Sequence, residues 1–149
     1  MIDYMDHSEN RDLLNAIRLL HSDEYTCVLC NAEQCFTTRQ RGVKPLLLWL
    51  EEGSIPKGFS AADKVVGKAT AFLYCLLGAK AVYSNVMSRS AKDVLEANGI
   101  YAECTELTDH IENRTKDGVC PFEMAVMKIS DSQQALASIY NKMNEMGIS

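Results

Sequence analysis

One run of the chain, Val65 to Leu77, is apolar on nearly every side of a helix and carries a single charged residue, Lys68. A helix of this composition is stable only when other elements cover it all round. Two short β-rich runs flank it, because Phe59 to Ala62 precedes it and Lys80 to Ser84 follows it. Strand, helix and strand in this order predict a right-handed parallel crossover, so the sequence indicates an α/β fold.

The remaining hydrophobic periodicities extend this pattern along the whole chain. Helical spacing and helix-ending glycines predict further helices over about residues 9–21, 43–52, 88–97 and 131–146, with a short one opening at residue 120. Residues 25–38 read as a hairpin and residues 100–104 as a last strand. We therefore expect a single domain over residues 1–149, with residues 1–8 flexible. Its architecture is predicted to be three-layer α/β/α, with a mixed sheet of one hairpin and then parallel strands.

Composition narrows the classes of function. The chain has 149 residues, a formal net charge of −5 and 47% hydrophobic residues, as an ordinary globular protein does. We expect no binding to nucleic acid or to a membrane surface, because both require a basic protein surface. The acidic N-terminus does not resemble a signal peptide, so we expect a cytoplasmic protein whose six cysteines are free thiols.

Three motifs along the chain resemble one protein family. They are Arg41-Gly42-Val43-Lys44-Pro45-Leu46, Ala62-Asp63-Lys64-Val65-Val66-Gly67-Lys68-Ala69 and Gly118-Val119-Cys120-Pro121-Phe122-Glu123. Together they look like the bacterial and archaeal family catalogued as domain of unknown function 1893, over about Leu13 to Met143. The order of predicted elements is that of the cytidine deaminase fold. The resemblance implies a deaminase-like fold in a family without an assigned activity.

The two helix starts that hold zinc in deaminases carry no zinc ligands here. Zinc deaminases need a His or Cys with a nearby Glu at one helix start and a Pro-Cys-x-x-Cys pair at the next. The equivalent segments, Arg41 to Lys44 and Asp63 to Lys68, contain neither His nor Cys. We therefore expect no metal, no cofactor and no hydrolytic zinc deamination.

The other cysteines and histidines do not suggest a metal site. Cys27 and Cys30 lie three positions apart in a strand, so their thiols point to opposite faces of the sheet. With Cys35 they are expected to be small core residues of the hairpin. The histidines, His7, His21 and His110, lack ligand spacing and are expected at the surface.

The start of the long apolar helix is the best candidate binding site. A helix start presents unpaired N–H groups and a positive dipole end, which favour an anion. Lys64 and Lys68 would lie four residues apart on one helical face, with Asp63 as the partner of Lys68 or as an acceptor from a sugar or base. Arg41 and Lys44 would face this helix start across a topological switch point of the sheet.

Gly67 belongs to the same candidate site. The segment is not a phosphate loop, because an earlier glycine is absent and Ala69 stands where Ser or Thr would hold magnesium. The structural alternative is that Lys64 and Lys68 are solvated and that Gly67 is small only to allow close packing.

Cys120 is a second candidate, because its sulfur would lie at a helix N-cap before Pro121. The helix dipole can make such a thiol acidic and reactive, and a purely structural cap is the alternative. Glu123 would be a ligand contact or the N3 residue of the capped helix. Asn113 and Arg114, in a polar loop, could close over a bound ligand.

Three functions follow from these residues. The first is binding of an anionic, phosphorylated, nucleotide-like molecule in a deaminase-like pocket without zinc. The second is a cysteine-dependent transferase or hydrolase that uses Cys120, with Asp63 as a further catalytic candidate. The third is a non-catalytic module that forms a homodimer through the Leu46-Leu47-Leu48-Trp49 helix or the last helix.

Overall fold

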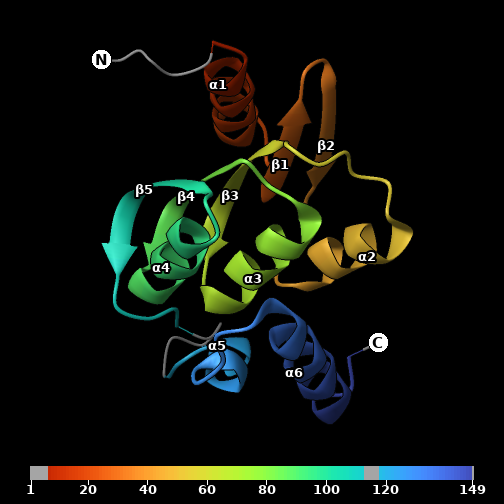
Figure 1. Ribbon diagram of the computed structural model, residues 1–149, viewed down its shortest axis with the longest axis vertical. Helices are drawn as coiled ribbons and strands as arrows, with labels where there is room; N and C mark the ends of the chain where they lie inside the picture. Colours follow the sequence, from red (N-terminus) through yellow and green to blue (C-terminus); the bar gives the residue numbers. More distant parts are fainter. Residues whose placement is uncertain (1–6, 113–117, 149) are drawn as a thin grey trace.

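The computed structural model describes residues 7–112 and 118–148, which form a five-stranded sheet covered by helices (Figure 1). The strands are β1 (Cys27–Asn31), β2 (Gln34–Thr38), β3 (Ser60–Val66), β4 (Ala81–Ser88) and β5 (Tyr101–Thr108). The helices are α1 (His7–Ser22), α2 (Lys44–Glu52), α3 (Lys68–Leu77), α4 (Arg89–Ala97), α5 (Pro121–Val126) and α6 (Ser132–Glu145).

The sheet is mixed and has the strand order β2-β1-β3-β4-β5. Strand β1 pairs antiparallel with β2 and with the central strand β3, whereas β3, β4 and β5 run parallel to one another. A helix joins each parallel pair, α3 between β3 and β4 and α4 between β4 and β5, as the crossover pattern requires. The prediction of one hairpin followed by parallel strands is confirmed.

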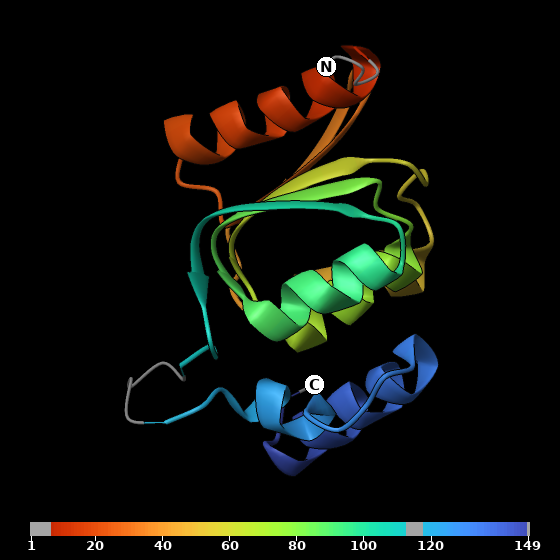
Figure 2. The ribbon, with the colours of Figure 1, turned by 60° about the vertical axis from the view of Figure 1, so that its left-hand side comes forward.

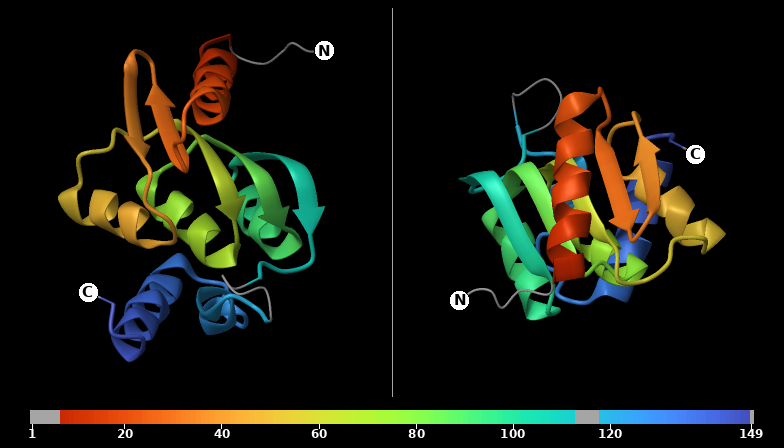
Figure 3. Two further views of the ribbon diagram at one scale, coloured as in Figure 1. Left: turned by 180° about the vertical axis from the view of Figure 1, so that it is seen from behind. Right: turned by 90° about the horizontal axis from the view of Figure 1, so that it is seen from above.

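Helix α1 covers one face of the sheet by itself (Figures 2 and 3). Its buried residues Leu13, Ala16 and Leu20 repeat at helical spacing and form a single apolar stripe. This stripe packs on the sheet residues Val28, Cys30, Ala62, Ala81 and Tyr83 and forms a separate buried cluster with them.

The opposite face of the sheet carries α2, α3 and α4, and α5 and α6 pack on the outer side of this layer (Figure 2). Val126 of α5 and Ile139 of α6 belong to the same buried cluster as Phe72 and Leu73 of α3. Helix α3 therefore lies between the sheet and the two C-terminal helices, which explains why it is apolar all round. The predicted three-layer arrangement is incomplete, because these two helices add a further layer.

The boundary between β3 and α3 differs from the prediction. The sequence suggested a helix from Val65, but β3 continues to Val66 and α3 begins at Lys68. Parallel pairing with Val86 and Met87 of β4 holds the two valines in the extended conformation that β-branched side chains favour.

Other boundaries differ less. Helix α1 begins at His7, within the segment expected to be flexible, and β5 continues to Thr108 in what was predicted to be a loop. Further along that loop, Glu112 forms an isolated bridge with Val119. Among the described helices, none is both long and apolar enough to cross a membrane.

We expect Leu73→Ala to destabilise the fold strongly, because Leu73 is 0% exposed on the helix that both layers cover. Loss of a fully buried leucine costs about 2–5 kcal/mol of unfolding free energy. Urea unfolding measures this loss. The matched control is Leu48→Ala on α2, where the side chain is 40% exposed, and an equal loss in both variants would contradict the assigned core.

Candidate functional site

A carboxylate from another helix closes the start of α3. Gly67, the N-cap residue, offers no side chain to the first amides of this helix. Instead, the Oε2 atom of Glu123 in α5 accepts a hydrogen bond of 3.0 Å from the amide of Ala69. Glu123 is only 8% exposed, so its carboxylate is held inside the protein at the positive end of the α3 dipole. The protein thus supplies its own anion at this helix start.

Glycine at position 67 is explained by this contact. A Cβ atom built on Gly67 would lie 2.4 Å from Oε2 of Glu123, much closer than real Cβ atoms approach a neighbour. The φ angle of Gly67 is −98°, which other residues adopt freely, so lack of space selects glycine. This lack of space agrees with close packing, the structural alternative for Gly67. Glu123 stands at the N3 position of α5, as one of its two predicted roles required, but its carboxylate bonds to the start of α3.

Lys68 makes the reciprocal contact. Its Nζ atom donates a hydrogen bond of 3.0 Å to the carbonyl of Met127, the C-cap residue of α5, and lies 5.8 Å from the centre of the Phe72 ring. A cation at a helix C-terminus complements the negative end of the dipole. Glu123 and Lys68 thus tie α5 to the start of α3 by two opposite charges. Because Lys64 lies in β3 and Lys68 in α3, the predicted pair of lysines on one helical face is wrong.

Thr26 joins two basic segments that are distant in sequence. Its carbonyl accepts a hydrogen bond of 3.0 Å from the amide of Lys64, and its Oγ1 donates a bond of 2.6 Å to the carbonyl of Gln40. These bonds hold the loop before α2 beside the end of β3. The side chains of Arg41, in that loop, and of Lys64 are both exposed.

The start of α2 differs from that of α3 in having no side-chain cap. Its N-cap residue Val43 makes no capping hydrogen bond, and no acidic residue lies in the first turn. Lys44 is exposed at this turn, and Pro45, which has no N–H, occupies one of the positions that lack an intrahelical partner. Next to the loop, the guanidinium of Arg39 lies 4.5 Å above the Tyr25 ring. Arg39, Arg41 and Lys44 lie on the segment that leads into this uncapped helix start, and hydrogen bonds through Thr26 place the backbone of Lys64 beside that segment. These four basic residues are called the basic surface below.

Asp63 faces the interior on the α3 side of the sheet. Its Oδ2 atom accepts a hydrogen bond of 2.7 Å from the hydroxyl of Tyr74, and its Oδ1 atom accepts one of 3.4 Å from the amide of Val65. The Tyr74 hydroxyl also lies 3.0 Å from Sγ of Cys27, the residue opposite Asp63 in the β1–β3 pairing. Asp63, the predicted partner of Lys68, is bound to Tyr74 instead, so that pairing is wrong.

Burial perturbs all three groups of this cluster. It raises the pKa of Asp63 to about 6, against the opposing effect of the Tyr74 hydrogen bond. Burial and the charge of Asp63 raise the pKa of both Tyr74 and Cys27 well above their usual values. Asp63 is therefore the group of this cluster that changes protonation near neutral pH. It can hold or release a proton there, as a general acid or base must.

Cys120 does not cap its helix. It is the N-cap residue of α5 and half-buried, but its sulfur accepts no hydrogen bond from the first-turn amides. The backbone amide of Cys120 donates a bond of 2.9 Å to the carbonyl of Ile111. The structural cap predicted for this sulfur is thus wrong. Asn113 and Arg114 lie outside the described residues.

The predicted site residues fall into two groups. Arg41, Lys44 and Lys64 belong to the basic surface, while Gly67, Lys68 and Glu123 form the sealed start of α3. Two cavities of about 560 and 600 Å³ lie elsewhere, one between α1 and the β1–β2 hairpin and one against the ends of β3, β4 and β5. None of these six residues lines either cavity, and Arg41, Lys44 and Lys64 are exposed.

Some residues of the site were not predicted. These are Thr26, Tyr74 and the Arg39–Tyr25 pair, which lie outside every motif of the sequence. Their roles follow only from the residues that they contact in the structure. A partial signal existed for the contact of Glu123 with Gly67, because both residues stand in the family-like motifs of the sequence.

No metal centre is formed within residues 7–112 and 118–148, where no three His, Cys, Asp or Glu side chains could hold an ion. Cys27 and Cys30 are buried in separate clusters on opposite faces of the sheet, as predicted. Cys35, in contrast, is exposed and is not a core residue. His21 and His110 are exposed, in agreement with the sequence.

These features define an α/β protein with one mixed sheet and an internally sealed helix start. The model of a family described as TM1506, domain of unknown function (DUF1893), matches residues 15–143. The chain belongs to this DUF1893 family. A crystal structure of a DUF1893 family protein (TM1506) from Thermotoga maritima has the same fold, with a TM-score of 0.82 at 19% sequence identity, over 95% of this chain and 99% of that chain. No curated protein matches the chain.

Gly67→Ala should destabilise the protein through its clash with Glu123. We expect a loss of about 1–3 kcal/mol from overpacking, measured by urea unfolding. Glu123→Ala alone should also destabilise, because the Ala69 amide loses its partner. The double variant should lose less than the sum of the single losses, since the new methyl group then has room. Strict additivity of the two losses would contradict the contact.

The raised pKa of Asp63 predicts a specific dependence of stability on pH. Because the folded-state pKa of about 6 exceeds the unfolded value of about 3.9, protonated Asp63 favours the folded state. This contribution is complete below about pH 4 and is lost as the pH rises through 6. Asp63→Asn should therefore gain stability relative to the wild type between pH 4 and 7, on the order of 2–3 kcal/mol.

Urea unfolding at intervals of one pH unit measures the effect of Asp63→Asn. Asp93→Asn, on the exposed side of α4, controls for the loss of a negative charge. Parallel pH profiles for the wild type and Asp63→Asn would show that Asp63 is not perturbed.

Proposed function

We propose that the protein binds an anionic, phosphorylated, nucleotide-like small molecule at the basic surface next to the start of α2. The observation that carries the proposal is a pair of hydrogen bonds at Thr26, one accepted from the Lys64 amide and one donated to the Gln40 carbonyl. Together they hold the loop before α2 beside the end of β3. Arg41, Lys44 and Lys64 offer positive charge in an otherwise acidic protein with a net charge of −5. The uncapped amides of α2 add donors that suit phosphate oxygens.

A planar group next to the phosphate would find a partner in Arg39. Its guanidinium already stacks on Tyr25, and the outer face of this pair offers a flat surface to a nucleobase. This supports a nucleotide-like ligand over inorganic phosphate alone. Asp63, near the same end of β3, points toward α3 and is bonded to Tyr74. In this proposal it holds a proton and does not contact the ligand.

The same proposal includes a deaminase-like origin of the fold. The order of helices and strands, and the position of the two helix starts after β2 and β3, support it. In a zinc deaminase these helix starts carry the metal ligands. Here the first is basic and the second holds Glu123, so neither set of side chains fits a zinc ion.

The other two functions find less support. A cysteine-dependent enzyme needs a base beside Cys120, and no hydrogen bond to the Cys120 thiol is formed within the described residues. A homodimer through α2 needs an exposed apolar face, but Leu46 and Leu47 are buried and Leu48 is the exposed leucine of this run. Both remain proposals of lower rank.

Thermal unfolding with added ligands tests the binding proposal. A nucleoside diphosphate at ten times its dissociation constant should stabilise the protein by about 1.4 kcal/mol, a rise of a few degrees in the melting temperature. The shift should be larger than with inorganic phosphate, and 0.5 M salt should reduce it. Arg41→Ala and Lys64→Ala should weaken it.

The control for this measurement is Lys92→Ala on α4, which removes a lysine that pairs with Glu96 far from the basic surface. It should keep the full shift. Equal loss of the shift in all three variants, or no shift with any phosphorylated compound, would refute the proposal.

A further inference from the structure

Two thiols lie opposite each other on the hairpin. Cys30 of β1 and Cys35 of β2 are directly paired, one residue pair from the turn, and their Sγ atoms are 2.8 Å apart without a bond. Directly opposed residues of an antiparallel pair have Cβ atoms about 4.5–5.5 Å apart, and a disulfide needs about 3.5–4.5 Å. A small approach of the two strands is therefore enough to bond these sulfurs.

Access to the two thiols is unequal. Cys30 is 0% exposed beneath α1, whereas Cys35 is exposed on the edge strand. Burial, and then the neighbouring Cys35, raise the pKa of Cys30 above its usual value. An external reagent therefore reaches Cys35 first, and Cys30 can react only with the sulfur of Cys35. This is the arrangement of an attacking thiol and a resolving thiol.

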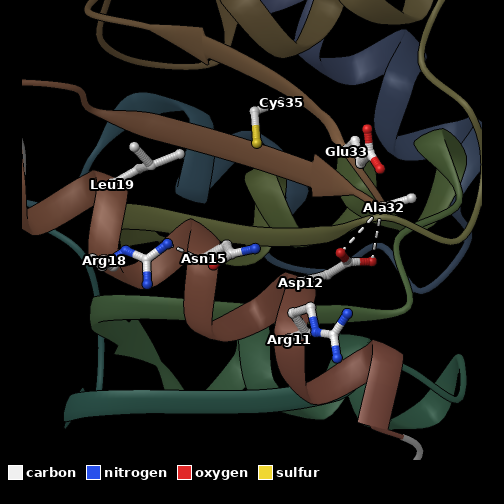
Figure 4. A pocket seen from close by; sticks show the side chains of 8 residues that line it. All are labelled: Arg11, Asp12, Asn15, Arg18, Leu19, Ala32, Glu33 and Cys35. Carbon is white, nitrogen blue, oxygen red and sulfur yellow. Dashed lines mark hydrogen bonds between the residues drawn. The ribbon is translucent and has the colours of Figure 1, made fainter.

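The exposed thiol opens into the cavity of about 560 Å³ between α1 and the hairpin (Figure 4). The sulfur of Cys35 points toward α1, where Asn15 and Arg18 lie. The Nη2 atom of Arg18 donates a hydrogen bond of 2.7 Å to Oδ1 of Asn15, which holds the guanidinium at this wall. Arg11 lines the same cavity further along the helix.

The acidic groups of the cavity are engaged or turned away. Asp12 accepts two hydrogen bonds, of 3.1 and 3.2 Å, from the amide of Ala32 at the hairpin turn, where Ala32 has a φ of +56°. Glu33 follows on the turn, and Figure 4 shows its carboxylate directed away from the Cys35 sulfur. Within the part of the chain that the structure describes, Arg11 and Arg18 are thus the charged groups of this cavity without a carboxylate partner.

We propose that Cys30 and Cys35 form a thiol–disulfide exchange site that reacts with small disulfides bearing carboxylate groups. The cavity admits the reagent, Arg18 binds a carboxylate, and Cys35 carries out the first attack. This site is independent of the basic surface proposed above, because none of the residues that line its cavity belongs to that surface.

The reaction balances in two exchanges. The Cys35 thiolate attacks one sulfur of the disulfide R–S–S–R, forms a Cys35–S–S–R bond and releases R–S⁻, which takes up a proton. Cys30, losing its proton as it attacks, displaces the second R–S⁻ from Cys35 and forms the Cys30–Cys35 bond. The two protein thiols lose two electrons and two protons, and R–S–S–R becomes two molecules of R–SH.

The test exposes the reduced full chain to oxidised glutathione, which is anionic, and in parallel to cystamine, which is cationic. After the remaining thiols are alkylated, mass spectrometry of the intact chain and of its peptides locates each product. We expect a Cys30–Cys35 disulfide, with two hydrogens lost and the other four cysteines alkylated. Cys30→Ala should retain glutathione on Cys35, and Cys35→Ser should form neither product. Rapid quenching of the wild type traps the same mixed disulfide should Cys30→Ala fail to fold.

Arg18→Ala tests the class of reagent. It should slow the reaction with oxidised glutathione roughly two- to fivefold, the effect of one partly exposed ion pair, and should not slow the reaction with cystamine. Lys92→Ala is the control and should leave both rates unchanged. Reduced Cys30 and Cys35 in wild type at equilibrium with oxidised glutathione would overturn the exchange site. Equal rates in Arg18→Ala and wild type for both reagents would overturn the assignment to anionic disulfides.

Discussion

The contact between the Glu123 carboxylate and the start of α3 attaches the C-terminal helices α5 and α6 to the helix layer that covers the sheet. α3 is the element that both the sheet and the C-terminal helices cover, and its first turn has no cap of its own. Glu123 supplies that cap from α5, and Lys68 returns a cation to the other end of α5. Gly67 is the residue that makes the approach possible, because any side chain there would occupy the place of the carboxylate. A buried charge of this kind is stable only because it is bonded at a positive helix end.

This internal cap also decides where an external anion can bind. Three helices, α2, α3 and α4, begin after strands at this end of the sheet, and each start has the dipole end that favours phosphate. The start of α4 is capped by its own Ser88, which leaves the starts of α2 and α3 to compare. The start of α3 is already neutralised by Glu123, so a second anion there would meet like charge. The start of α2 has neither a capping side chain nor an acidic first turn. The proposed ligand surface is therefore the one of the two that the protein leaves open, and Thr26 attaches the Lys64 segment to it.

The sequence predicted the types of element and a mixed sheet of one hairpin and parallel strands, because both depend on local periodicity and on crossover handedness. The order of the strands came from the structure. It failed at the end of β3, where Asp63 and Lys64 looked like a helix start, since pairing with β4 extends the strand beyond them. The predicted site residues are grouped differently in the structure. Lys64, Lys68 and Glu123 all stand in motifs, yet which of them meet depends on the packing of α5 on α3, which no local pattern encodes. Thr26 and Tyr74 could not be found, because their hydrogen bonds join residues up to 47 positions away.

Strand β1 carries one cysteine toward each face of the sheet, one beside the Asp63 cluster and one beside Cys35. Side chains alternate along a strand, so Cys27 points to the α3 side, where it contacts Tyr74 next to Asp63, and Cys30 points to the α1 side, where it faces Cys35. Burial raises the pKa of both thiols, and Cys27 contacts the buried Tyr74 hydroxyl rather than a second thiol. Cys30 is equally buried, but its partner reaches solvent. Cys27 is therefore structural, whereas Cys30 belongs to the proposed reactive pair. The difference comes from the edge strand β2, which places the exposed Cys35 opposite Cys30.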